Sequence, residues 1–160
     1  MGAGKTTIGR KLARKLKFQF FDSDQEIENR TGVKIALIFD IEGETGFRTR
    51  ETDIIDELTK HPEIVLATGG GAVLDPVNRK ALCERGVVVY LQAGLGHLVK
   101  RTAADTKRPL LNVDNPKQRL ASLLEQRDPI YREMADLIVK TDNKAQNKIV
   151  DEIVKYKKSL

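Results

Sequence analysis

Several residue types are scarce in this sequence of 160 residues. It has one cysteine, Cys83, two histidines and no tryptophan, and aromatic residues make up 5%. A lone cysteine excludes an internal disulfide, and this set of residues argues against a zinc site. Few aromatic rings argue against a nucleic-acid partner, because single strands bind by stacking. There is neither a secretory leader nor an apolar run of membrane-spanning length, so we expect a cytoplasmic protein without a membrane partner.

Charged residues, by contrast, are abundant. They make up 32% of the sequence and leave a net charge of +5. The basic residues are dispersed among acidic ones, which favours solvated helix faces together with attraction of small anionic substrates. A chain of this length buries roughly 70% of its unfolded surface as one domain. We therefore predict a single domain over residues 1–160, and a monomer.

The hydrophobic pattern alternates between helical stripes and short apolar runs. Ile8, Leu12 and Leu16 mark one face of a first helix, and apolar runs follow at 18–21, 64–67, 87–91 and 137–139. Alternation of this kind predicts an α/β fold with a parallel sheet. The runs at 64–67 and 87–91 are continuous, as in strands buried on both faces.

The sequence opens with half of a phosphate-binding motif. Gly4-Lys5-Thr6 matches the end of G-x-x-x-x-G-K-[ST], and an amphipathic helix follows it. In such a loop, backbone N–H groups and the lysine hold phosphates, and the hydroxyl reaches Mg²⁺. A chance tripeptide at a helix start is the alternative interpretation.

Two further clusters follow predicted strands, at the sheet edge where α/β proteins bind ligands. Asp22 and Asp24 suit a metal shell and a substrate hydroxyl, or else the N-cap of the next helix. The glycines at 69–71 suit a backbone that approaches an anion, or else a flexible turn. Arg48, Arg108 and Arg132 are candidate anion clamps, although most arginines are surface charges and spacing alone does not single these out.

Taken together, the blocks MGAGKTTIGR, FDSDQEIENRTG, IFDIEGETGFRTRE, VLATGGGAV, VVVYL, KRPLL and RDPIYRE resemble the shikimate kinase family. The resemblance implies a three-layer α/β/α P-loop kinase with a parallel sheet in the order 2-3-1-4-5. It also implies transfer of the γ-phosphoryl group of ATP to the 3-hydroxyl of shikimate, in aromatic amino-acid biosynthesis. A substrate-binding segment at about 30–60 and a lid at about 104–115 are implied as well.

The resemblance also implies individual roles. Catalysis falls to Asp24 as base, Lys5 and Arg108, and the metal ligands are Thr6 and Asp22. Shikimate contacts Asp24 and the residues Arg48, Gly70, Gly71 and Arg132. The residues implied for ATP are Gly2, Ala3, Gly4, Lys5, Thr6, Thr7, Arg101, Arg108 and Gln146.

The first, central strand of the resembled fold has no counterpart in this sequence. We expect a natural protein longer by about ten to fifteen residues, enough for a strand and a turn. Another small-metabolite kinase, such as gluconate kinase, is the nearest alternative function. A non-catalytic nucleotide-binding protein is a second alternative, because the phosphate loop is incomplete.

Overall fold

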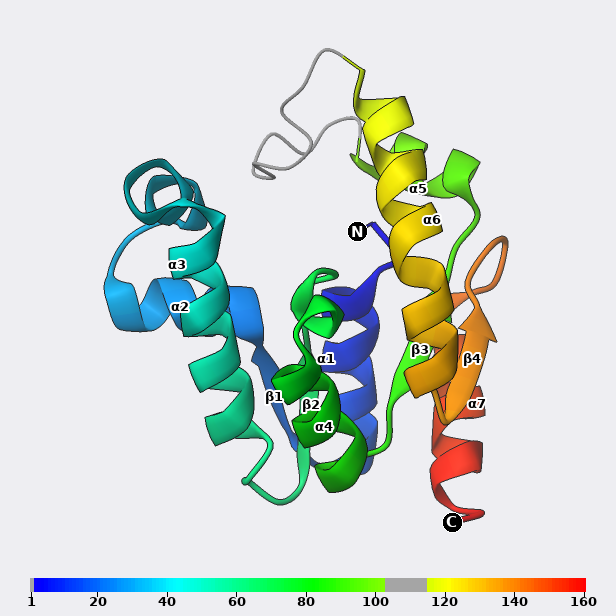
Figure 1. Ribbon diagram of the computed structural model, residues 1–160. Helices are drawn as coiled ribbons and strands as arrows, with labels where there is room; N and C mark the ends of the chain where they lie inside the picture. The colour runs from blue at the N-terminus through cyan, green and yellow to red at the C-terminus, as the bar shows by residue number, and fades with distance from the viewer. Residues whose placement is uncertain (1, 103–114) are drawn as a thin grey trace.

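The computed structural model describes residues 2–102 and 115–160. Helices and short strands alternate along these parts of the chain (Figure 1). In chain order the elements are α1 (Lys5–Leu16), β1 (Gln19–Asp22), α2 (Ser23–Thr31), α3 (Ile35–Leu58), β2 (Ile64–Ala67), the 3₁₀ turn η1 (Ala72–Leu74), α4 (Pro76–Arg85), β3 (Val89–Gln92), α5 (Leu95–Thr102), α6 (Pro116–Met134), β4 (Leu137–Lys140) and α7 (Gln146–Lys157).

The strands form two separate parallel pairs. β1 pairs with β2, with Gln19 opposite Ile64, and β3 pairs with β4, with Val89 opposite Leu137. Among the described residues no strand joins β2 to β3. The prediction of an α/β fold with parallel strands is therefore confirmed.

The burial of β2 and β3 differs from the prediction. Continuous apolar runs predicted that β2 and β3 are buried on both faces, but most of their residues are only partly buried. Val87, expected at the start of β3, lies outside it and is 45% exposed. Continuous apolar runs are typical of strands that are covered on both faces, and the described residues cover β2 and β3 only partly.

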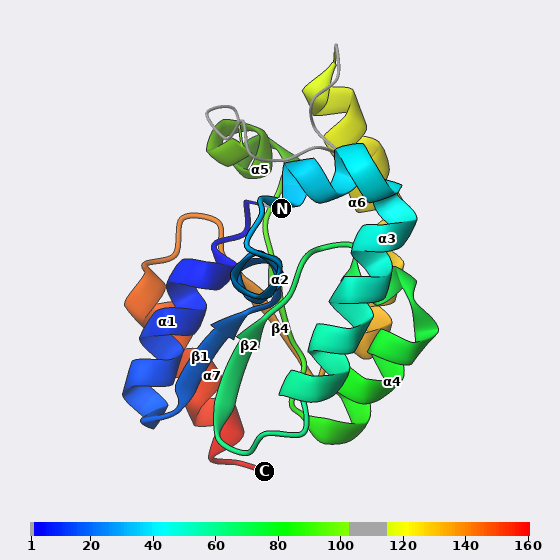
Figure 2. The ribbon, with the colours of Figure 1, turned by 90° about the vertical axis from the view of Figure 1, so that its left-hand side faces the viewer.

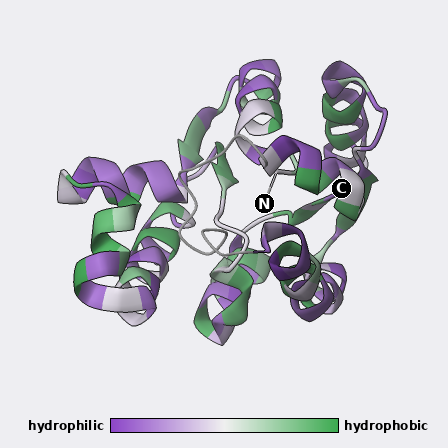
Figure 3. Cartoon of the chain, turned by 90° about the horizontal axis from the view of Figure 1, so that it is seen from above, coloured by the Kyte–Doolittle hydropathy of each residue, from purple (hydrophilic) through white to green (hydrophobic). Residues whose placement is uncertain are grey.

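Helices cover both faces of the strands, in the predicted three layers (Figure 2). α1 and α7 pack together on one side, and α3, α4 and α6 lie on the other. Seen from above, the strands and the inner sides of the helices are mainly hydrophobic (Figure 3). Ile8 and Leu12 of α1 meet Ile149 and Ile153 of α7 in one core cluster, so the predicted stripe on the first helix is confirmed.

α3 is broken at Gly43, which has φ 70° and ψ −176°. A residue with a side chain is strained at this φ, so glycine is required here. The break brings Glu42 and Arg50 together, with Arg50 Nη2 2.7 Å from Glu42 Oε1. The first part of α3 therefore turns away from the second, which packs Ile54 and Leu58 into the core.

Candidate active site

The N-terminus of α1 is prepared for an anion. Gly4 precedes the helix at φ 89°, Gly2 has φ 69°, and no acidic residue lies in the first turn. The first N–H groups of a helix lack intrahelical acceptors, and the helix dipole adds partial positive charge there. Lys5 adds a full charge at the same point. This end of α1 suits phosphate oxygens, as the half motif predicts.

Thr6 and Asp22, the two predicted metal ligands, are in direct contact. Thr6 Oγ1 donates a hydrogen bond of 2.7 Å to Asp22 Oδ2. Mg²⁺ is commonly held by one or two protein oxygens, with water and nucleotide phosphates completing its shell. No cluster of three or more acidic, histidine or cysteine ligands occurs among the described residues. The Thr6–Asp22 pair thus fits a nucleotide-bound Mg²⁺ rather than a site built of protein ligands alone.

Asp22 also connects this pair to Asp24. Its Oδ1 accepts a hydrogen bond of 3.2 Å from the Asp24 backbone N–H, so Asp22 is the N-cap of α2. The capping and ligand interpretations of Asp22 are therefore compatible, because each uses a different carboxylate oxygen. Asp24 lies in the first turn of α2, and its side chain faces the backbone of Gly69.

The glycines at 69–71 are held by three different elements. Gly69 N–H donates a 3.2 Å hydrogen bond to Oγ of the buried Ser23, and Gly70 C=O accepts one of 2.5 Å from the Tyr131 hydroxyl. A Cβ on Gly69 would lie 2.6 Å from Glu51 Oε1, and one on Gly71 would lie 2.2 Å from Arg48 Nη2. Both distances are shorter than van der Waals contact. Close approach of charged side chains, rather than turn flexibility, explains glycine at 69 and 71.

Arg48 lies against this loop and is held by two carboxylates. Its Nη1 donates to Glu51 Oε2 at 2.5 Å, and its Nη2 donates to Glu44 Oε1 at 2.9 Å. The Glu51 side chain is fully buried, whereas that of Glu44 is half exposed. Burial raises the pKa of Glu51, Arg48 opposes this shift, and the charge of Asp24 adds to it. The guanidinium is therefore positioned before any ligand arrives.

Arg127 of α6 faces the same group of residues. Its side chain is buried, and its Nε has no hydrogen-bond partner within the described residues. Burial raises the pKa of Glu51 and that of Tyr131, one turn further along α6, and the charge of Arg127 opposes both shifts. A buried guanidinium with an unused donor is costly unless an anion completes it. Arg127 and Arg48 thus both act on Glu51 and on Tyr131.

Arg132, the arginine of α6 that the sequence predicted for the acceptor, does not lie with Arg48 and Glu51 in the structure. Arg132 Nε donates to Asp128 Oδ2 at 2.6 Å, and the side chain is 49% exposed. Asp128 Oδ1 in turn accepts a hydrogen bond from the Tyr90 hydroxyl. Five positions separate the two arginines, so they leave α6 in different directions. Arg127, rather than Arg132, is the arginine of α6 whose charge acts on Glu51.

A signal for Arg127 was present in the sequence. The buried residues of α6 are Leu120, Leu123, Arg127 and Met134, which recur at the spacing of one helix face. An arginine on an apolar stripe must be paired inside the protein. Reading the helix face, instead of the motif alone, would have separated Arg127 from Arg132.

Of the other residues predicted to contact the nucleotide, the structure places one next to the phosphate loop. Arg101 of α5 donates from Nη1 to Gly2 C=O at 3.2 Å, which places it next to the phosphate loop. Gln146 is exposed at the first position of α7, which packs beside α1. Arg108 and the lid predicted at 104–115 lie outside the described residues, apart from position 115.

The contacts form one continuous chain across the sheet edge. Thr6 contacts Asp22, Asp22 contacts Asp24, and Asp24 and Glu51 both border Gly69. Glu51 then leads to Arg48, and from there to Gly71. The N-terminal end of α1, the carboxylate of Asp24 and the guanidinium of Arg48 are thus linked by successive contacts.

None of the described helices is long and apolar enough to span a bilayer.

A protein-family model described as shikimate kinase matches residues 1–158. The shikimate kinase of Chromohalobacter salexigens is 54% identical over 160 residues, which are all of this chain and 89% of that protein. The enzyme of the same name from Burkholderia thailandensis is 55% identical over 154 residues, covering 96% of this chain and 84% of that one.

Solved structures agree with these relatives. The shikimate kinase from Acinetobacter baumannii in complex with shikimate superimposes with a TM-score of 0.97 at 50% identity, over 99% of this chain and 89% of that one. The enzyme from Aquifex aeolicus gives a TM-score of 0.84 at 32% identity, over 96% of this chain and 89% of that one. Each identity and coverage is far beyond what a shared fold alone produces. The chain therefore belongs to the shikimate kinase family.

Proposed function

We propose that this protein transfers the γ-phosphoryl group of ATP to the 3-hydroxyl group of shikimate. The observation that carries the proposal is the placement of Arg48 against Gly71, beside Glu51, on which the charge of Arg127 also acts. Asp24 lies next to Gly69, between this group and the end of α1. Membership of the shikimate kinase family and the shikimate complex of the A. baumannii relative support it.

The acceptor is held by its carboxylate and its hydroxyl. Arg48 and Arg127 grip the carboxylate, and the backbone of Gly70 and Gly71 lines the same site. Guanidinium groups match a carboxylate in a bidentate manner, so two of them also fix the orientation of the ring. Arg132, the residue predicted from the sequence, stays outside this grip as a surface residue paired with Asp128.

Asp24 binds the attacking hydroxyl and takes its proton. It suits this role because its carboxylate lies beside Gly69, where Glu51 also lies. Its backbone N–H is bonded to Asp22, the residue proposed for Mg²⁺. A positioned base contributes about 10²–10⁴-fold to a rate.

The nucleotide occupies the other end of the site. N–H groups at Gly4, together with Lys5, hold its phosphates, and Arg101 lies near the loop for the base. Thr6 and Asp22 hold Mg²⁺, which neutralises phosphate charge when it is bound. Arg108, which lies outside the described residues, stays a prediction for the transferring group. The monomeric state, the cytoplasmic location and the absence of nucleic-acid or membrane partners also stay predictions.

A panel of acceptors tests the proposal. ADP release is coupled to NADH oxidation with ATP and Mg²⁺, with shikimate, gluconate or no acceptor present. We expect turnover with shikimate alone. Release with gluconate but not shikimate would favour the related metabolite kinase. No release with any acceptor, in a chain that is folded by circular dichroism, would favour the non-catalytic alternative.

A further inference from the structure

The carbonyl group of Gly70 is held by a tyrosine hydroxyl from a distant part of the chain. Tyr131 of α6 donates a hydrogen bond of 2.5 Å to this carbonyl, across a separation of 61 positions. Burial raises the pKa of Tyr131, so the hydroxyl keeps its proton at neutral pH and can donate it. A single side-chain atom of α6 thus contacts one peptide group of the glycine loop.

Gly70 and Gly71 are the two central residues of a tight turn. Ala72 N–H donates a hydrogen bond of 3.2 Å to Gly69 C=O, which closes a four-residue turn. Gly71 has φ −91° and ψ −8°, the values of the third residue in a type I turn. The turn is therefore of type I, with the peptide group between Gly70 and Gly71 at its centre.

Two glycines allow a second form of the same turn. Rotation of the central peptide group by about 180° converts type I into type II, in which the third residue has φ near +80°. A residue with a side chain is strained at this φ, but glycine adopts it readily. The backbone of Gly70 and Gly71 permits both forms, so contacts with the rest of the protein decide between them.

The other hydrogen bonds of the loop do not fix this peptide group. Ser23 Oγ accepts from Gly69 N–H at 3.2 Å, which fixes the peptide group before the turn. Leu74 N–H donates to Gly71 C=O at 3.0 Å, which fixes the peptide group after it. Among the hydrogen bonds between described residues, only the one from Tyr131 reaches the central peptide group. The choice of the type I form therefore depends on this hydroxyl.

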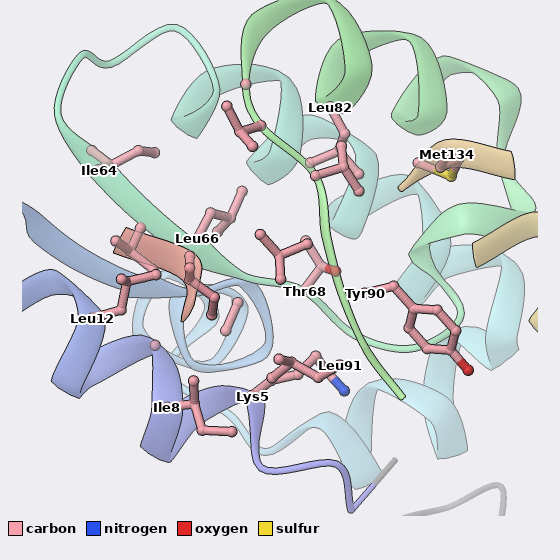
Figure 4. Close-up of a pocket in the computed structure, with 18 of the residues that line it drawn as sticks. Lys5, Ile8, Leu12, Ile64, Leu66, Thr68, Leu82, Tyr90, Leu91 and Met134 are labelled. Atoms are coloured by element: carbon pink, nitrogen blue, oxygen red, sulfur yellow. The ribbon is translucent and has the colours of Figure 1, made fainter. Parts of the chain in front are cut away.

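Tyr131 is itself positioned by a neighbouring tyrosine. Its ring packs against that of Tyr90, with centroids 5.0 Å apart and planes tilted by 40°. Tyr90 projects from β3 on the side opposite Leu91 (Figure 4), and its hydroxyl donates to Asp128 Oδ1 at 2.7 Å. Asp128 precedes Tyr131 by three positions on the same face of α6. The two rings share one contact, but only the hydroxyl of Tyr131 bonds the glycine loop.

The direction of the central peptide group affects the acceptor end of the site. The C=O and N–H of a trans peptide group point in opposite directions, so a carbonyl bonded to Tyr131 directs the N–H of Gly71 away from Tyr131. Arg48 lies so close to Gly71 that a Cβ there would overlap its Nη2. In the type I form, an anionic oxygen held by Arg48 has the N–H of Gly71 as a further donor. The type II form would present the carbonyl of Gly70 in its place.

We propose that Tyr131 is a positioning residue, whose hydroxyl holds the turn 69–72 in the type I form and so presents the N–H of Gly71 to an oxygen of the acceptor. The identity of this acceptor as shikimate rests on the proposed function, whereas the hold on the turn does not. Without the hydroxyl both forms are populated, and the apparent affinity for the acceptor falls with the fraction of type I. One hydrogen bond shifts such an equilibrium by a factor of about three to ten.

Two matched variants separate the hydroxyl from the ring. Tyr131→Phe and Tyr90→Phe each remove one oxygen and keep the contact between the rings. NMR of the chain without ligands reads the turn, because the couplings between the amide and α protons of Gly71 depend on φ. We expect one form, with φ near −91°, in the parent and in Tyr90→Phe. In Tyr131→Phe we expect couplings averaged between this value and about +80°.

The kinetics with shikimate provide the second readout. Tyr131→Phe should raise KM for shikimate by about three- to tenfold. It should leave kcat and KM for ATP within about twofold of the parent, because a saturating acceptor draws the turn into the type I form. Tyr90→Phe should leave all three constants within about twofold of the parent. A general loss of packing would instead affect both variants alike.

Three results would overturn the proposal. They are parental Gly71 couplings in Tyr131→Phe, averaged couplings without a rise in KM for shikimate, and equal effects of the two variants on this KM. If the parent turns over no shikimate, the proposed function fails, and the couplings alone decide whether Tyr131 holds the turn. If Tyr131→Phe does not fold, the parent decides. One Gly71 form with a slowly exchanging Tyr131 hydroxyl proton supports the proposal, and two forms or a freely exchanging hydroxyl overturn it.

Discussion

Replacing Arg48 by alanine should leave a buried carboxylate without its counter-ion. Arg48 Nη1 lies 2.5 Å from Glu51 Oε2, and the Glu51 side chain is 0% exposed. The other partner of Arg48, Glu44, is 48% exposed and is solvated without it. The cost of the variant therefore comes from Glu51 rather than from Glu44.

The magnitude follows from the burial of this pair. Removing one partner of a buried ion pair lowers the free energy of unfolding by about 3–5 kcal/mol. We expect the lower end, about 3 kcal/mol, because Arg48 itself is 19% exposed. In a domain of this size that lowers Tm by roughly 6–12 °C. The control Glu44→Gln removes an exposed ion pair and should cost less than about 1 kcal/mol.

The loss should depend on pH in a defined direction. Burial already raises the pKa of Glu51, and removal of the opposing Arg48 charge raises it further. Below the pKa of an unfolded glutamate, about 4.3, Glu51 is protonated in both states and the loss is small. As the pH rises, the unfolded state releases its proton first, so unfolding becomes easier until the folded pKa is passed. The deficit relative to the parent therefore grows from about pH 4 upward.

Urea denaturation of the parent and both variants between pH 4 and 8 measures these free energies. Glu51→Gln in the Arg48→Ala background should restore much of the loss at neutral pH and flatten its pH dependence. A deficit that is the same at pH 4 and pH 7, or a double variant no more stable than Arg48→Ala, would refute the reasoning.

Three further predictions concern the proposed reaction. Asp24→Asn should lower kcat by about 10²–10⁴-fold while fluorescent-nucleotide binding persists, and near-normal turnover would exclude it as the base. Arg127→Lys should raise KM for shikimate by roughly tenfold or more, because an ammonium group cannot copy the planar guanidinium fork. Arg132→Lys should change this KM little. A larger rise for Arg132→Lys than for Arg127→Lys would restore the assignment made from the sequence. Gly71→Ala places a Cβ 2.2 Å from a guanidinium nitrogen, so we expect a higher KM for shikimate and an unchanged KM for ATP. Gly96→Ala, with no atom within 4 Å of the added Cβ, is its control, and equal effects of the two alanines would argue against a steric cause.

Local sequence signals predicted the phosphate end of the site well. Gly4 before an amphipathic helix predicted an anion-binding helix start, and the structure places positive φ and no acidic residue there. Asp22 was assigned to a cap or to a metal, and the structure shows the cap, which joins residues two positions apart. The role of Asp22 as a metal ligand stays a prediction.

The acceptor end depends on contacts over long separations, and there the sequence was less informative. Glu51 was not singled out, because only the fold shows that its side chain is fully buried beside Gly69. Arg132 was chosen over Arg127 because a motif does not say which way each side chain leaves a helix. The apolar runs predicted β2 and β3, but their partial burial required the structure.

The break at Gly43 determines the direction of the first part of α3. In an uninterrupted α-helix, Glu42 and Arg50 would be separated by about 12 Å along the axis. The structure instead joins them by two hydrogen bonds, of 2.7 and 3.0 Å. One absent methyl group therefore decides the direction of eight residues, 35–42, relative to the rest of α3. A side chain at this position would be strained at φ 70°, while the second half of α3 keeps its place in the core.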